Sequence, residues 1–140
     1  MTKLFLDTNV ILDFILKREG FANEAALIFD LGERNKLQLY LSSLSINNID
    51  YVVSKIESKQ KSRQIILKLL SLVEILSVDK STIKKAALSE FKDFEGAVQN
   101  FCAEEANLKH ILTRDLKDFK KSKLSIQTPK EFLAGFKFKK

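Results

Sequence analysis

The stretch that most constrains the fold is residues 4–13, which read LFLDTNVILD. The apolar run before Asp7 is too short for a buried helix, and an apolar helical pattern begins soon after it. We therefore expect a buried strand whose carboxyl end delivers Asp7 to the start of a helix. Because open α/β sheets bind ligands just outside the carboxyl ends of their strands, Asp7 marks the edge where a site is expected.

The rest of the chain alternates between strand-like and helical patterns. Further strands are expected at 37–41, 73–78 and 111–113, with a short edge strand at 124–127. Helices are expected from Asn23 to Gly32, from 43 to 56, from 65 to 72, from a cap at Ser81 or Thr82 to Phe91, from Asp93 onward, and from Thr128-Pro129. We interpret residues 57–63 as a solvated connection between two helices. This alternation is typical of a parallel sheet covered by helices on both faces.

Length and composition set the broad class. At 140 residues the chain is expected to form a single domain, 1–140, with a flexible tail at 134–140. Phe136 and Phe138 of this tail could dock on a partner. A single cysteine fits a reducing cytosol, and no apolar run reaches the ~18 residues of a membrane span. The net charge of +6 suits a polyanionic partner.

Acidic and small polar residues recur where strands end or helices begin. Asp7-Thr8-Asn9, Asp93-Phe94-Glu95 and Arg114-Asp115 are the three clusters, with Asp118 three residues further on. Each acid alone could be a helix cap or a turn residue. If the first and fourth strands are neighbours, however, Asp7 and Asp115 come close, and gathered carboxylates require protons or cations. All-oxygen ligands suit Mg²⁺ or Mn²⁺, which predicts metal-assisted phosphodiester hydrolysis.

The helix from Asp93 has an apolar stripe and a polar face. The stripe at i, i+3, i+4, i+7 and i+8 is Phe94, Ala97, Val98, Phe101 and Cys102. On a helical wheel, Asp93 and Asn100 lie on the opposite side, with a gap at Gly96. Glycine inside a helix costs up to about 1 kcal/mol relative to alanine, and no local feature of the sequence requires it there.

Five stretches together resemble the PIN-domain family, and within it the VapC-like toxins of toxin–antitoxin pairs. They are LDTNVILD at 6–13, SSLSINNIDYVVSK at 42–55, DFEGAVQNFCAEEA at 93–106, LTRDLKDF at 112–119 and TPKEFL at 128–133. The resemblance implies a three-layer α/β/α sandwich around a parallel sheet of four to five short strands. It also implies an Mg²⁺- or Mn²⁺-dependent ribonuclease in the cytoplasm, a homodimer, RNA as substrate and a cognate antitoxin as partner.

The resemblance also assigns roles to single residues. The family's first acid matches Asp7 and its last acid matches Asp115, whereas its second acid falls at Asn48 and its third at Gly96. Asp93 or Glu95 could reach the space left at Gly96, and by angle Asp93 is the better candidate. The expected catalytic residues are therefore Asp7, Asp93 and Asp115, and the expected metal ligands are Asp7, Asp93, Glu95 and Asp115. The residues expected to position substrate are Thr8, Asn9, Asn48, Thr113 and Arg114.

Two other functions remain open at this point. The missing acids at Asn48 and Gly96 are also compatible with a degenerate PIN domain that binds RNA or a protein partner without cleaving it. A receiver-like or nucleotide-binding α/β domain is the third reading, and the absence of a GxGxxG fingerprint and of a P-loop argues against it.

Overall fold

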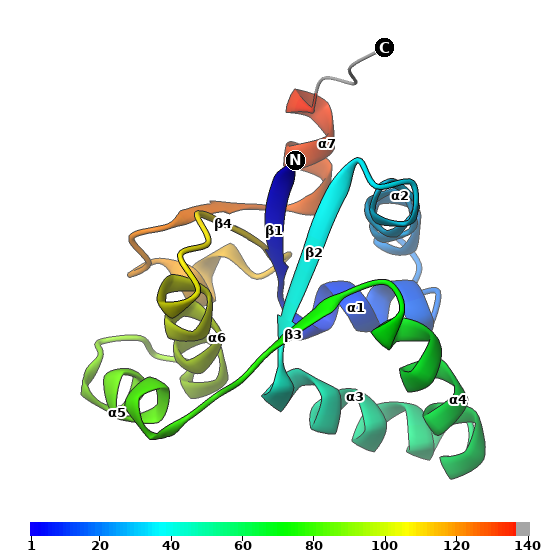
Figure 1. The fold of residues 1–140 in the computed structure, drawn as a ribbon, viewed down its shortest axis with the longest axis horizontal. Helices are drawn as coiled ribbons and strands as arrows, with labels where there is room; N and C mark the ends of the chain where they lie inside the picture. Colours follow the sequence, from blue (N-terminus) through cyan, green and yellow to red (C-terminus); the bar gives the residue numbers. More distant parts are fainter. Residues whose placement is uncertain (137–140) are drawn as a thin grey trace.

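A computed structural model of the protein describes residues 1–136, which form a five-stranded parallel sheet with helices on both faces (Figure 1). The strands are β1 (Thr2–Leu6), β2 (Leu37–Ser42), β3 (Glu74–Leu76), β4 (His110–Leu112) and β5 (Ser125–Gln127), and their order in the sheet is β3-β2-β1-β4-β5. All four pairings are parallel. The expected three-layer α/β/α sandwich is confirmed.

Helices fill the connections between strands, and one more helix follows the last strand. They are α1 (Thr8–Ile15), α2 (Ala22–Glu33), α3 (Ser43–Ile56), α4 (Lys59–Leu70), α5 (Lys80–Leu88), α6 (Phe94–Glu105), the short 3₁₀ helix η1 (Leu116–Phe119) and α7 (Pro129–Gly135). In Figure 1, α1 to α4 lie on one side of the sheet, and α5 and α6 lie on the other. Parallel strands joined by helical crossovers give this two-sided cover.

The central strand β1 is buried from both sides. Leu4 and Leu6 belong to the core shared with α1, α2 and α3, whereas Phe5 belongs to a second core with residues of α6. All three side chains are inaccessible to solvent. Since successive side chains of a strand point to opposite faces, this short apolar run supplies both layers of the sandwich at once.

The position of β1 between β2 and β4 brings the two predicted acids to one edge. Leu6 is in register with Leu112 of β4, and the Asp7 amide donates to the Leu112 carbonyl at 3.0 Å. The expectation that the first and fourth strands are neighbours is confirmed. The carboxyl ends of β1 and β4 therefore present Asp7 and the loop bearing Asp115 side by side.

Two predicted boundaries around the second and fourth helices were wrong. Gly32 lies inside α2, which ends at Glu33, because its missing side chain lets the helix approach β2 closely. Most of the stretch at 57–63 is helical, because Ser58 caps α4 by accepting from the Lys61 amide at 3.0 Å and residues 59–63 form its start.

The caps and ends of the later helices also differ from expectation. Asp79, not Ser81 or Thr82, caps α5, in a capping box with Thr82, and α5 ends at Leu88. Residues 134 and 135 of the expected flexible tail belong to α7, and Phe136 packs on Phe132 with ring centroids 5.4 Å apart. Phe138 lies outside the described residues.

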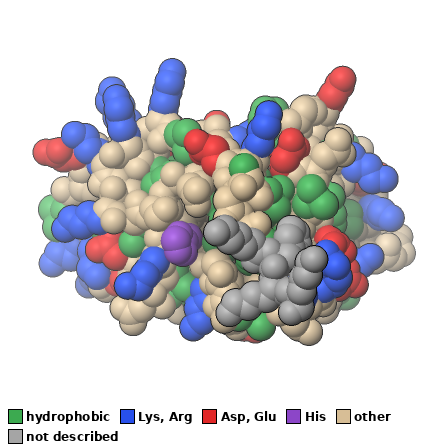
Figure 2. Space-filling model, turned by 90° about the horizontal axis from the view of Figure 1, so that it is seen from above, with side chains coloured by type: hydrophobic (Ala, Val, Ile, Leu, Met, Phe, Trp, Pro, Cys, Tyr) green, Lys and Arg blue, Asp and Glu red, His purple; other side chains and the backbone are tan. Residues whose placement is uncertain are grey.

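The end of the molecule where the strands begin carries side chains of both charges among its described residues. Figure 2 shows this end, with lysine and arginine side chains spread among acidic and apolar groups. His110 lies here, at the start of β4, at the opposite end of that strand from Asp115. Within residues 1–136, no helix combines the length and apolar character needed to cross a bilayer.

The close approach of α2 to β2 gives a stability prediction. A Cβ at Gly32 would lie 2.7 Å from Cδ1 of Leu39, a side chain that is itself buried. Gly32→Ala should therefore lower the free energy of unfolding by about 1–2 kcal/mol, since overpacking outweighs the gain of about 1 kcal/mol in helix propensity. Gly135→Ala is the matched control, because no neighbour lies within 4 Å of a Cβ there. Equal urea denaturation midpoints for the two variants would contradict this account.

Candidate active site

Asp7 occupies the N-cap position of α1, but its side chain makes no capping hydrogen bond. Its carboxylate instead accepts from Gln99 Nε2 at 2.9 Å and from Thr113 Oγ1 at 2.7 Å. The side chain is almost fully buried, with 6% exposed. The simple reading of Asp7 as a helix cap is therefore excluded, and its carboxylate is held between α6 and the end of β4.

The surroundings of Asp7 disfavour its charge. Burial raises the pKa of its carboxyl to about 6, and the two hydrogen bonds offset only part of that rise. The negative charges of Asp115 and Glu95 raise the pKa further. A carboxylate that is ionised at neutral pH in these surroundings is poised to attract a cation.

Glu95 reaches from α6 to the start of α1 and to α3. Its Oε1 accepts from Thr8 Oγ1 at 3.1 Å and from Asn48 Nδ2 at 2.8 Å. Thr8 is anchored in turn, since its hydroxyl lies 2.7 Å from the Ser45 hydroxyl. Asn48, which stands where the resemblance places a second acid, thus serves as a donor that fixes the carboxylate of Glu95.

Asp93 does act as a cap, as one reading of the sequence held. Its Oδ2 accepts from the Gly96 amide at 2.8 Å. A Cβ at Gly96 would lie 3.1 Å from this same oxygen and 3.5 Å from the Asp118 carbonyl. Gly96 therefore faces Asp93 and η1, and an acid at this position would lie among the carboxylates already present.

Asp115 is held by hydrogen bonds from two directions. Its Oδ2 accepts from Asn9 Nδ2 at 3.2 Å, and its amide donates to Thr113 Oγ1 at 3.0 Å. Thr113 thereby links the two acids, since the same hydroxyl donates to Asp7. The neighbouring Arg114 pairs with Asp13, with its Nε 3.3 Å from the acid's Oδ2.

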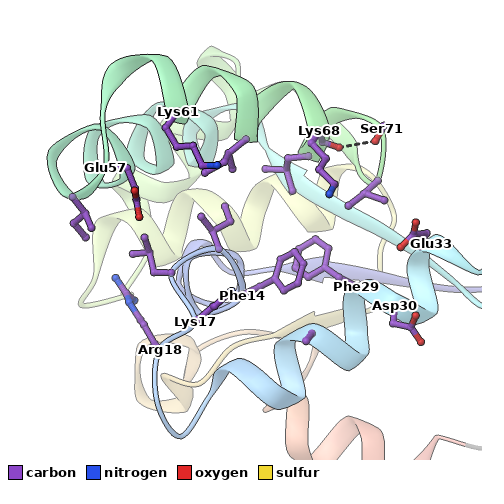
Figure 3. Close-up of a pocket in the computed structure, with 17 residues that line it drawn as sticks. Phe14, Lys17, Arg18, Phe29, Asp30, Glu33, Glu57, Lys61, Lys68 and Ser71 are labelled. Carbon is purple, nitrogen blue, oxygen red and sulfur yellow. Dashed lines mark hydrogen bonds between the residues drawn. The ribbon is translucent and has the colours of Figure 1, made fainter.

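These polar groups surround a cavity of about 250 Å³. Its polar lining consists of Asp7, Thr8, Asn9, Asn48, Asp93, Glu95, Gln99 and Asp118, and its apolar lining of Leu12, Tyr51, Val52 and Phe119. Asp115 lies outside this lining, yet its charge raises the pKa of both Asp7 and Asp118. A larger hollow of about 1070 Å³, between α1, α2 and α4 (Figure 3), is lined by none of the candidate acids.

Sequence reasoning missed one residue of this site. Gln99, one turn after Gly96, donates to Asp7 and accepts from the Thr8 amide at 3.2 Å. Asn100, which the helical wheel placed with Asp93 on the polar face, does not line the cavity and accepts from Ser122 Oγ. The predicted apolar stripe does not match the buried face of α6. Phe94 is 53% exposed, and the helix is buried on several sides.

Asp118 was noted in the sequence, three residues after Asp115, but was given no role in the site. Burial raises the pKa of its carboxyl, and the charges of Asp93 and Asp115 add to the rise. The 3₁₀ turn of η1 brings position 118 back toward the cavity, and recognising this turn would have identified Asp118.

The oxygen donors of the cavity fit a hard divalent cation whose coordination substrate would help to complete. Among the described residues, no group of three histidine, cysteine or acidic side chains is close enough to hold a metal ion by itself. Mg²⁺ commonly binds through one or two carboxylates, several waters and substrate phosphates, so a closed protein cage is not required. The carboxylates of Asp7 and Asp118, whose pKa values are raised by burial and by neighbouring acids, supply the uncompensated negative charge.

Comparisons with known proteins identify the family and agree with the fold. A profile of the PIN domain matches residues 3–117. Ribonuclease VapC1 of Aquifex aeolicus (strain VF5) is 33% identical over 135 residues, which cover 93% of this chain and 92% of that protein.

Solved structures share the fold at lower identity. A toxin-antitoxin complex from Klebsiella pneumoniae contains a chain with a TM-score of 0.68 and 22% identity, covering 90% of this chain and 97% of that chain. VapBC2 from Rickettsia felis, bound to a promoter DNA fragment, contains one with a TM-score of 0.66 and 19% identity, covering 91% and 98%.

The burial of Asp7 predicts a pH-dependent gain in stability for Asp7→Asn. The folded-state pKa, about 6, lies above the ordinary value of about 4. The folded protein therefore binds the proton more tightly than the unfolded chain, and the cost of ionisation is absent below pH 4, grows between pH 4 and 6, and is complete above pH 6. Asn should stabilise the fold by up to about 3 kcal/mol at pH 7.5.

Urea denaturation at pH 4, 5, 6 and 7.5 measures this difference. The wild type and Asp7→Asn should converge at pH 4 and separate as the pH rises. A difference that is constant across this range would show that the charge of Asp7 is not the source of the effect.

Proposed function

The chain belongs to the PIN-domain family, and from this premise we propose that it is a metal-dependent endoribonuclease of the VapC-like toxin class. The observation that carries the proposal is the convergence of acids from three segments on one cavity. Asp7 follows β1, Asp93 and Glu95 begin α6, and Asp118 lies in η1. Such a cluster suits an all-oxygen site for Mg²⁺ or Mn²⁺.

In this proposal Asp7 and Asp115 hold the ion, and Asp93, Glu95 or Asp118 contributes from the cavity wall. When bound, the ion polarises the scissile phosphate and lowers the pKa of a coordinated water. The reaction is hydrolysis of a phosphodiester bond in RNA, which leaves a 5′-phosphate and a 3′-hydroxyl.

The polar residues around the acids act mainly by orienting them. Thr113 is inaccessible to solvent and donates to Asp7, so its proposed role is to fix that carboxylate rather than to touch RNA. Asn48 fixes Glu95 and Asn9 fixes Asp115 in the same way. Contacts with RNA phosphates then come from the exposed lysines of η1 and the residues after it, Lys117, Lys120 and Lys121.

The proposed partners follow from the relatives. The curated relative is named as a ribonuclease, and the solved neighbours include a toxin-antitoxin complex. By analogy, this chain would act on RNA in the cytoplasm, form a homodimer and be held inactive by a cognate antitoxin.

A second candidate function is binding of RNA or of a protein partner without cleavage. It is favoured by Asn48 and Gly96, which stand where the family places two of its acids. Asn48 donates to Glu95 and adds no negative charge. Gly96 supplies no carboxylate, and the Asp93 carboxylate lies 3.1 Å from where a Cβ would be.

The first test is cleavage of RNA by Asp7→Asn. The variant keeps the size of the side chain and should remain folded, so its cleavage rate in Mn²⁺ should fall by more than about a hundredfold. Asp30→Asn is the matched control, because Asp30 is an exposed acid of α2 whose partner is Arg34. RNA cleavage at the wild-type rate by Asp7→Asn would rule out this assignment.

The second test separates the two candidate functions with Gly96→Asp. A carboxylate there would join Asp93 and the turn at Asp118, so the Mn²⁺ dissociation constant measured by calorimetry should tighten about tenfold. Gly96→Asn, which has the same shape without the charge, should not tighten it. If Gly96→Asp gains neither metal affinity nor cleavage, the binding function is favoured.

A further inference from the structure

A buried acid outside the cavity organises the approach to Asp115. Asp13 on α1 is 2% exposed, and each of its two carboxylate oxygens faces an arginine. Its Oδ1 lies 3.4 Å from Arg18 Nη1, and its Oδ2 lies 3.3 Å from Arg114 Nε. Asp13 is absent from the cavity lining, so it does not belong to the acids that would face an ion directly.

The first path from Asp13 leads to the side chain of Asp115. Arg18 Nη1 also donates to Asn9 Oδ1 at 3.3 Å, and Asn9 Nδ2 donates to Asp115 Oδ2 at 3.2 Å. An asparagine amide has one accepting and one donating end. Because Arg18 engages the oxygen, the amide is oriented with its NH₂ toward Asp115; the reversed amide would set two oxygens against each other.

The second path leads to the backbone beside Asp115. Arg114 immediately precedes it, and the Arg114 guanidinium lies between Asp13 and the ring of Phe21, 4.2 Å from the ring centroid. The ion pair and the ring contact together restrain Arg114, and with it the start of the loop that carries Asp115.

Stability alone is a weak reason for this arrangement. A buried ion pair is often no better than well-packed apolar side chains of similar volume, because burial removes the charges from water. The pKa of Asp13 is raised by burial even against its two arginines. The burial of Asp13 has a desolvation cost, and both of its arginine partners lead to Asp115. Its presence is therefore better explained by the side chains that it orients.

We propose that Asp13 and Arg18 are positioning residues that set the carboxylate of Asp115 through the amide of Asn9. The inference deepens the proposed ribonuclease function and rests on it, because orientation matters to activity only if Asp115 serves in the site. Outer residues that orient a metal-binding carboxylate commonly change affinity or activity by 10–100-fold, roughly, when they are replaced.

Arg18→Met tests the proposal while sparing the buried acid. Arg18 is partly exposed, and Arg114 remains to pair with Asp13, so the variant should fold. We expect kcat for RNA to fall about tenfold with KM nearly unchanged, and the Mn²⁺ dissociation constant to weaken about tenfold. Arg18→Lys, which keeps a positively charged donor group, should recover most of both losses.

The matched control is Arg34→Met, which removes an arginine that pairs with exposed Asp30 on α2. It should leave kcat and Mn²⁺ affinity at wild-type values. Wild-type values for Arg18→Met, or losses that Arg18→Lys does not reduce, would overturn the positioning role.

An NMR measurement distinguishes failure of this inference from failure of the proposed function. The side-chain amide signals of Asn9, identified by their loss in Asn9→Ala, should shift in Arg18→Met and stay in place in Arg34→Met, whether or not the protein cleaves RNA. If the wild type cleaves no RNA but the Asn9 signals shift, the ribonuclease proposal fails and the positioning network stands. Unshifted Asn9 signals would overturn the network itself.

Discussion

The burial of one carboxylate at the end of the central strand is the constraint on which the site depends. The run before Asp7 packs into both layers of the sandwich, so the strand cannot end elsewhere without uncovering a core. Asp7 is thereby carried into a place where burial raises its pKa to about 6. Thr113 and Gln99 hold it as neutral donors, which orient the carboxylate without cancelling its charge.

The acidic side chains in and near the cavity differ in their partners. Among the described residues, the side-chain hydrogen bonds of Asp7 and Glu95 come from hydroxyl and amide groups, so their negative charge is left available to a cation. Asp13, by contrast, is compensated by two arginines and lies outside the cavity. Because of this separation, Arg18 and Arg114 do not compete with a metal ion for the acids of the cavity. They still orient Asn9 and the loop that carries Asp115.

The sequence predicted the sheet, the edge at which the acids meet and most of the residues there, because strand periodicity and the chemistry of Asp7 and Asp115 are local signals. It missed Gln99, because a wheel cannot show that α6 packs on several sides. It gave no sign that Arg114 pairs with Asp13, because that pairing depends on α1 lying against the loop after β4. Contacts between segments so distant in sequence depend on tertiary packing, which no short pattern reports.

The measurement that tests the account most directly is calorimetric titration of Mn²⁺ into the wild type and into Asp7→Asn at pH 7.5. The account holds that uncompensated carboxylates around Asp7 form a cation site. It predicts sub-millimolar binding to the wild type and loss of that binding in Asp7→Asn. Absence of binding to the wild type, or equal binding to both proteins, would contradict it.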